Sequence, residues 1–171
     1  MKKILVMASG NGSNFEAIVE YFRNKDVLIE LLCNIEGANV ISRAKRLGIK
    51  YFIVKFTDTY KFLKDKKYDL YVLAGYMRIL PRNVLALGRF INIHPSLLPE
   101  FRGLNAIKRA YNSGCKVTGV TVHYVEEEVD TGEIIAARKC EIEQGMALCE
   151  LEGKIHQIEH NMYPKIIEEI L

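Results

Sequence analysis

The sequence predicts an α/β fold, with a doubly wound and mostly parallel sheet that becomes mixed or antiparallel toward the C-terminus. Short, almost wholly apolar runs alternate with helical periodicity through residues 1–80, as expected for parallel strands covered on both faces. From Val117 onward the periodicity changes to two-residue alternation, which is typical of antiparallel strands. Together these two patterns define the fold class.

The first 80 residues repeat a strand-helix unit. The expected strands are 3–8, 27–33, 51–54 and 69–74, and the expected helices are 14–23, 38–47 and 60–67. Gly48 follows the second helix, where a glycine commonly ends a helix. Because parallel neighbours are joined by right-handed crossovers, these units should wind helices over both faces of the sheet.

The second half changes its pattern after Pro81. It contains a short helix, a strand at 90–93, a helix near 105–112, and strands at 117–125 and 134–142 that suggest a hairpin-like pair. From Met146 one helix is expected, with Pro164 kinking or breaking it because proline lacks a backbone donor. No repeat or linker is evident, so we expect one domain over residues 1–171.

The composition excludes several classes of protein. At 49% hydrophobic and 26% charged residues it is typical of a globular domain, and no apolar run approaches the roughly 18 residues of a membrane span. The net charge of +3 is dispersed, so no nucleic-acid surface is expected. The four cysteines show no zinc-ligand spacing, which favours reduced thiols in the cytoplasm and no metal.

A glycine-containing turn, Ser9–Asn14, separates the first expected strand from the first helix. Such a turn converges backbone N–H groups at the positive end of the helix dipole, so it can bind a phosphate. Alternatively, Ser13 and Glu16 fit a capping box, and the turn binds nothing. The third glycine of a dinucleotide fingerprint is absent, which disfavours a nicotinamide cofactor. Glu16 is expected to point away from a bound anion or to be offset by a cation.

Asn92 and His94 lie two residues apart on an expected strand, so their side chains should emerge on the same face. At the carboxyl end of a central strand they would reach the ligand crevice of an open α/β sheet. An amide and an imidazolium can both stabilise the oxyanion of a carbonyl under attack. The alternative is a strand-end histidine with one backbone hydrogen bond and no ligand.

The segment Glu126–Glu133 is rich in acidic residues, which usually indicates a solvated loop. Asp130 differs from its neighbours because Thr131 and Gly132 can form a tight turn that fixes its direction. A carboxylate directed at His94 would favour the imidazolium and orient the ring.

Four segments together resemble a known family: Gly10–Asn14, Ala74–Leu80, Asn92–Pro99 and Asp130–Gly132. They are similar to the phosphoribosylglycinamide formyltransferase branch of the folate-dependent formyltransferases, and the resemblance covers essentially the whole chain. It implies an enzyme with a formyltransferase-like fold.

The resemblance also implies a reaction, in which the formyl group of 10-formyltetrahydrofolate is transferred to the amine of glycinamide ribonucleotide. The product would be formylglycinamide ribonucleotide in de novo purine synthesis, formed through a tetrahedral oxyanion and without a metal. By position, Asn92 and protonated His94 would hold the oxyanion, while Asp130 would keep His94 charged and relay the proton.

The remaining site residues are likewise implied by the resemblance. The ribonucleotide would be bound by Gly12, Ser13, Asn14 and Glu159. The folate would be bound by Met77, Arg78, Ile79 and Leu80 on one wall, and by Asn92, Glu126, Glu127, Glu128, Val129 and Asp130 on the other. Residues 1–80 would then be a phosphate-binding half, and residues 81–171 a catalytic and folate-closing half. Both partners are small molecules, and a homodimer stays open.

Some positions depart from the family pattern. The segment Phe56–Lys61 has no arginine where members often carry one near the folate, Asn105 stands where histidine is usual, and Arg102 stands where proline is common. The sequence ends soon after Pro164, so a longer C-terminal tail is expected to be dispensable.

Three alternatives are compatible with parts of the pattern. Methionyl-tRNA formyltransferase and formyltetrahydrofolate deformylase share the Asn92–Pro95 and Asp130–Gly132 signatures, but usually carry a further domain. A non-catalytic nucleotide-binding sensor module would use only the glycine turn, and would leave the three polar side chains of the second half unexplained.

Overall fold

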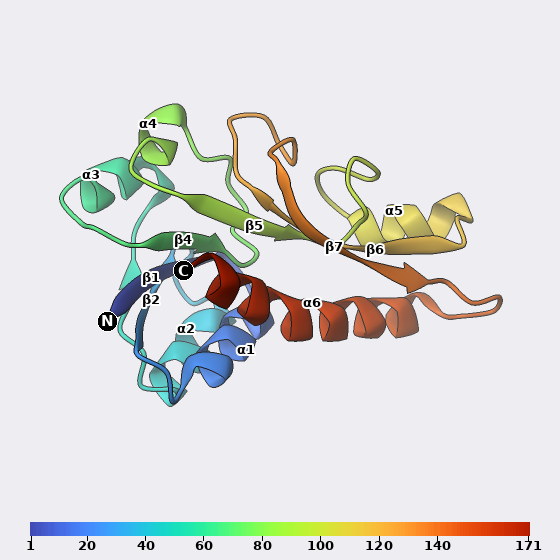
Figure 1. Ribbon diagram of the computed structural model, residues 1–171, viewed down its shortest axis with the longest axis horizontal. Helices are drawn as coiled ribbons and strands as arrows, with labels where there is room; N and C mark the ends of the chain where they lie inside the picture. Colours follow the sequence, from blue (N-terminus) through green and yellow to red (C-terminus); the bar gives the residue numbers. More distant parts are fainter.

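The computed structural model describes all residues, 1–171, as seven strands, six α-helices and one 3-10 turn (Figure 1). The strands are β1 Lys2–Ala8, β2 Val27–Cys33, β3 Tyr51–Ile53, β4 Leu70–Leu73, β5 Phe90–His94, β6 Val117–Tyr124 and β7 Ile134–Glu141. The helices are α1 Ser13–Phe22, α2 Asn39–Arg46, α3 Thr59–Leu63, α4 Arg82–Leu85, α5 Ala106–Ser113 and α6 Leu148–Ile170, with the 3-10 turn at Phe56–Asp58.

All strands belong to one sheet in the order β3-β2-β1-β4-β5-β6-β7. The five strands from β3 to β5 are parallel, whereas β6 runs antiparallel to β5 and β7 runs antiparallel to β6. The predicted fold class, doubly wound and mostly parallel with an antiparallel C-terminal part, is confirmed.

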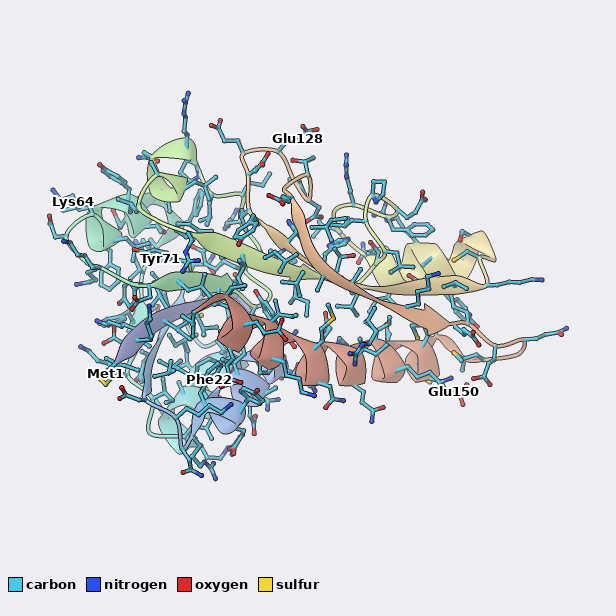
Figure 2. The ribbon with its side chains drawn as sticks, viewed as in Figure 1. Met1, Phe22, Lys64, Tyr71, Glu128 and Glu150 are labelled. Carbon is cyan, nitrogen blue, oxygen red and sulfur yellow. The ribbon has the colours of Figure 1, made fainter.

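The sheet is covered on both faces, and strand alternation assigns each residue to a face. Along β1, Ile4 and Val6 face the core under α1, α2 and α6, while Leu5 and Met7 face the core under α3 and α4. Figure 1 shows α1, α2 and α6 below the sheet and α3 and α4 above its left half. Figure 2 labels one large member of each core, Phe22 and Tyr71.

Of the kink or break expected at Pro164, the break does not occur, because α6 continues through it to Ile170. The prolyl ring removes one helical hydrogen bond. Tertiary contacts offset that loss: Tyr163 and Ile167 are fully buried on the same helix. The Tyr163 hydroxyl also donates to backbone carbonyls of β4 and β5, at 2.9 Å from Leu73 O and 3.3 Å from Ile91 O. Packing against the sheet therefore outweighs the local preference of proline.

Smaller differences concern helix ends and thiols. The helix expected at 60–67 ends at Leu63, before the charged segment 64–67. All four cysteines are free, but only Cys33 and Cys140 are buried. None of the helices combines the length and apolar composition needed to cross a bilayer.

Candidate active site

A cavity of about 640 Å³ opens beyond the carboxyl ends of β1, β4 and β5, where an open α/β sheet usually binds its ligand. Its lining comes from the first turn of α1, the end of β4 and the loop after it, the end of β5, the loop before α5, the end of β6 with the loop to β7, and α6. Figure 2 labels Glu128 on the β6–β7 loop, beyond the ends of the strands. A larger hollow of about 1110 Å³ lies at the far end of β6 and β7, but no histidine lines it.

Three polar side chains from two separate segments meet in the smaller cavity. Asn92 and His94 project from β5, and Asp130 reaches them from the β6–β7 loop. Asp130 Oδ2 lies 3.3 Å from His94 Nδ1, and Asp130 Oδ1 lies 3.5 Å from Asn92 Nδ2. The structure therefore brings these three residues together, as the sequence predicts.

Both ring nitrogens of His94 face acceptors. Nδ1 faces the Asp130 carboxylate, and Nε2 lies 2.9 Å from the backbone carbonyl of Phe101. Neither partner can donate a proton, so each contact is a hydrogen bond only when the ring nitrogen carries the proton. The Phe101 carbonyl thus occupies the hydrogen-bonding direction of His94 that Asp130 leaves, where an oxyanion would have to bind.

Asp130 is held in an unusual backbone conformation, with φ of 54°. Its loop closes tightly on β6, since a Cβ at Gly132 would overlap the Tyr124 backbone. The Gly103 N–H donates to Asp130 Oδ2 at 2.8 Å. A strained, over-determined carboxylate of this kind is typical of a functional position.

The pKa of Asp130 lies below its usual range. Burial by itself would raise this pKa, but the hydrogen bond from His123, the Gly103 N–H, and the charges of His94 and His123 together outweigh burial. Asp130 is therefore a carboxylate, able to accept a proton, throughout the neutral range.

His123 is a site residue that the sequence analysis missed. It is 2% exposed, lies opposite Asn92 in the β5–β6 register, and places Nε2 3.4 Å from Asp130 Oδ1 and 3.3 Å from Asn92 Nδ2. Its Nδ1 lies 2.7 Å from the Tyr124 carbonyl. The two-residue alternation of β6 gives the face of His123, but its partners depend on the register with β5.

The turn after β1 presents an open helix N-terminus. Gly12 is the N-cap of α1 with φ of 79°, and no side chain caps the first-turn N–H groups. Because the cap is a glycine, the alternative capping box of Ser13 and Glu16 is not formed. Glu16 instead pairs with Arg43 and, at 2.5 Å, with Arg46, which lower its pKa. The expected offset of Glu16 by a cation is present.

The end of the cavity nearest α1 contains Asn14 and Glu159. Asn14 Nδ2 donates to Glu159 Oε2 at 3.2 Å, so the first turn of α1 is tied to α6. Asn14 Oδ1 is buried without a hydrogen-bond partner, and a ligand donor could satisfy it. Both residues line the cavity, whereas Gly12 and Ser13 lie beside it and do not.

The loop after β4 forms another wall of the cavity. Met77 and Ile79 expose 58% and 63% of their surface, so they are not core residues, whereas Leu80 is buried. The Arg78 guanidinium lies over the Phe56 ring, 5.8 Å from its centroid. The Met77 N–H donates to Ser9 Oγ at 2.8 Å, which joins this wall to the turn after β1.

The facing wall is the loop between β6 and β7, called the acidic loop below. Glu126, Glu128 and Val129 line the cavity with Asp130. Glu127 does not line it and pairs instead with Arg82 across 3.5 Å at the surface. No group of three or more His, Cys, Asp or Glu side chains is arranged to hold a metal ion.

Comparison with known proteins identifies the family. Residues 2–167 match the formyl transferase family. The chain belongs to this family. It is 43% identical to the phosphoribosylglycinamide formyltransferase of Bacillus subtilis, across 100% of this chain and 95% of that protein. The predicted resemblance is thus confirmed, and the chain is an enzyme of the formyltransferase class.

Solved formyltransferases share the whole architecture. A crystal structure of phosphoribosylglycinamide formyltransferase from Bacillus halodurans is 38% identical with a TM-score of 0.93, covering 99% of this chain and 95% of that one. Glycinamide ribonucleotide transformylase 1 from Geobacillus kaustophilus is 40% identical with a TM-score of 0.92, covering 100% and 99%. The formyltransferase fold therefore extends over the complete sheet.

Proposed function

We propose that this formyltransferase transfers the formyl group of 10-formyltetrahydrofolate to the amine of glycinamide ribonucleotide, giving formylglycinamide ribonucleotide for purine synthesis. The observation that carries the proposal is one cavity that joins the Asn92–His94–Asp130 cluster to the first turn of α1. A phosphorylated amine and a formyl donor could meet there.

The phosphate of the acceptor would bind at the open N-terminus of α1. Gly12, Ser13 and Asn14 supply uncapped backbone N–H groups at the positive end of the helix dipole. Glu159 and the unpaired Asn14 Oδ1 would accept hydrogen bonds from hydroxyl or amide groups of the same substrate. The amine would then point along the cavity toward Asp130.

The folate would occupy the other end of the cavity, between the loop after β4 and the acidic loop. Met77 and Ile79 offer exposed apolar surface to a flat ring, and backbone groups of Met77–Leu80 and Glu126–Asp130 offer its polar edge hydrogen bonds. Arg78 supplies a cation in the region where Phe56–Lys61 has no arginine.

The transfer is a direct attack. The lone pair of the amine forms a bond to the formyl carbon, and the carbonyl electrons move onto oxygen, where Asn92 Nδ2 and His94 donate hydrogen bonds. For His94 to do so, its Nε2–H must turn from the Phe101 carbonyl to the new oxyanion. Asp130 accepts the proton that the amine loses, directly or through a water. As the carbonyl re-forms, the bond to the folate nitrogen breaks, and that nitrogen takes up the proton that Asp130 had accepted.

Several further features belong to the same proposal. The partners are two small molecules, no metal takes part, and the free thiols fit the cytoplasm. The chain works as one domain, in which residues 1–80 bind phosphate and residues 81–171 carry catalysis and close over the folate.

A spectrophotometric assay of folate product tests the proposal, with glycinamide ribonucleotide present or omitted. Wild type should release tetrahydrofolate only when the acceptor is present, and His94→Ala should lower kcat by about a hundredfold or more, because an oxyanion donor is lost. Formate release without acceptor would favour a deformylase instead. Full activity of His94→Ala, with native circular dichroism, would contradict the mechanism.

A further inference from the structure

Ser9 connects the turn after β1 to the loop after β4 without lining the cavity itself. It directly follows β1, is 3% exposed, and begins the turn that leads to Gly12 at the N-terminus of α1. Its Oγ donates to Asn34 Oδ1 at 2.5 Å and accepts the Met77 N–H at 2.8 Å. Three segments that leave the carboxyl ends of β1, β2 and β4 therefore meet at one hydroxyl.

The two hydrogen bonds of Ser9 fix the direction of its hydroxyl. A serine hydroxyl has one proton to donate and two lone pairs that accept. Because Asn34 Oδ1 takes the proton, a lone pair is left for the Met77 N–H. Asn34 thus orients the hydroxyl of Ser9 in the sense that can hold the backbone of Met77.

The course of the backbone explains why a side chain is used here. β1 and β4 pair as parallel strands up to Met7 and Leu73. Two residues later the Ser9 N–H still reaches the Gly75 carbonyl, at 3.0 Å. Gly75 has φ of 76°, a left-handed conformation that interrupts the strand. The next N–H of this segment to bond β1 or its turn, that of Met77, therefore meets the Ser9 hydroxyl in place of a backbone carbonyl.

Beyond Met77 this wall of the cavity has no other backbone anchor. Residues 78–80 make no backbone–backbone hydrogen bond, so their N–H and carbonyl groups are available to a ligand. The buried side chains of Tyr76 and Leu80 hold the two ends of the segment in the core. Hydrophobic packing is non-directional, however, and does not fix how a backbone is turned. The hydrogen bond from Met77 to Ser9 supplies that direction.

We propose that Ser9 is a positioning residue for the folate: its hydroxyl, oriented by Asn34, fixes the backbone at Met77 and so aligns the groups of residues 78–80 that bind the donor. The inference rests on the proposed function for the identity of that donor. Ser9 acts through Met77 and touches neither substrate, so its loss should weaken donor binding and leave the chemical step nearly unchanged.

Steady-state kinetics of Ser9→Ala test this inference. KM for 10-formyltetrahydrofolate should rise about tenfold, the effect of freeing one hydrogen-bonded backbone group. kcat should stay within about threefold and KM for glycinamide ribonucleotide within about twofold, because the Ser9 N–H still bonds the Gly75 carbonyl and holds the turn. Ser113→Ala is the matched control and should leave all three constants unchanged. Ser113 Oγ likewise donates to a carbonyl, that of Ala110 at 2.7 Å, and accepts the Cys115 N–H at 3.3 Å, at the end of α5 away from the cavity.

Asn34 supplies a second test, because it acts on the wall only through the hydroxyl of Ser9. Asn34→Ala should raise KM for the folate about threefold in the wild-type background and not at all in the Ser9→Ala background. Calorimetric titration with tetrahydrofolate should show the same pattern without requiring catalysis, whereas ribose 5-phosphate should bind all three variants like wild type. Additive effects of the two substitutions, unchanged folate binding by Ser9→Ala, or equal weakening of both ligands overturns the inference.

Amide hydrogen exchange gives a readout that does not depend on whether Ser9→Ala folds. In wild type the Met77 N–H should exchange slowly although the residue is 58% exposed, and in Asn34→Ala it should exchange faster. The neighbouring Arg78 N–H, which has no backbone partner, should exchange fast in both. Fast exchange of Met77 in wild type contradicts the inference. If wild type fails to formylate glycinamide ribonucleotide yet Ser9→Ala selectively weakens tetrahydrofolate binding, the proposed function fails and the positioning role stands.

Discussion

Replacing Asp130 by asparagine removes one charge and one proton acceptor while keeping the shape of the side chain. In the structure Oδ2 accepts from the Gly103 N–H at 2.8 Å and faces His94 Nδ1 at 3.3 Å, so the single oxygen of asparagine can keep both contacts. Its amide nitrogen then takes the place of Oδ1. There it faces His123 Nε2 and, donor against donor, Asn92 Nδ2.

The expected magnitude follows from what is lost. Loss of a positioned general base slows a reaction by about 10²- to 10⁴-fold. The contact between two amide nitrogens should also turn Asn92 away from the position of the oxyanion, so we place Asp130→Asn above the lower end of that range, near its middle. We therefore expect kcat to fall about 10³-fold, or about 4 kcal/mol in the barrier. KM for both substrates should change less than about threefold, because the retained Gly103 hydrogen bond holds the loop.

Steady-state kinetics with both substrates varied, together with circular dichroism, measures this prediction. Asp69→Asn is a matched control, because Asp69 also accepts a backbone N–H, from Lys3 at 2.8 Å, and faces a cation, Lys2 at 3.3 Å, but lies at the opposite end of the strands. The control should keep kcat. If folded Asp130→Asn retains kcat within about threefold of wild type, the role of the carboxylate as proton acceptor is refuted.

Three further outcomes are expected. Tyr163→Phe should lower the free energy of unfolding by about 2 kcal/mol in urea titration, because two strand carbonyls lose a buried donor, and a change under about 0.5 kcal/mol would show that they are satisfied otherwise. Gly12→Ala should raise KM for glycinamide ribonucleotide at least about tenfold and leave KM for the folate unchanged. The reason is that φ of Gly12 is positive and the new Cβ would overlap Val40. Equal effects on both KM values would contradict a local role. Because the pKa of Asp130 is lowered, kcat should fall in a single step as the pH is lowered. That step comes from protonation of the acceptor amine, with an ordinary pKa of about 8. A second step between pH 5 and 7 would show that Asp130 titrates there.

The sequence predicts most of the fold because local patterns report burial directly. Apolar runs mark the central strands, and the change to alternation after Val117 marks the antiparallel pair. Local patterns fail where packing competes with propensity. Pro164 should break a helix by itself, but the buried neighbours of Pro164 hold α6 together.

The site residues likewise fall into those that the sequence predicts and those that only packing decides. Asn92 and His94 share a face because strand periodicity requires it, so the sequence by itself determined that pair, and the family motifs pointed to Asp130. Only the tertiary structure decided that Phe101 engages the second nitrogen of His94, that His123 faces Asp130, and that Glu159 on α6 reaches Asn14 on α1. Those contacts depend on strand register and on how α6 lies against α1, and both are set by packing between residues far apart in the chain.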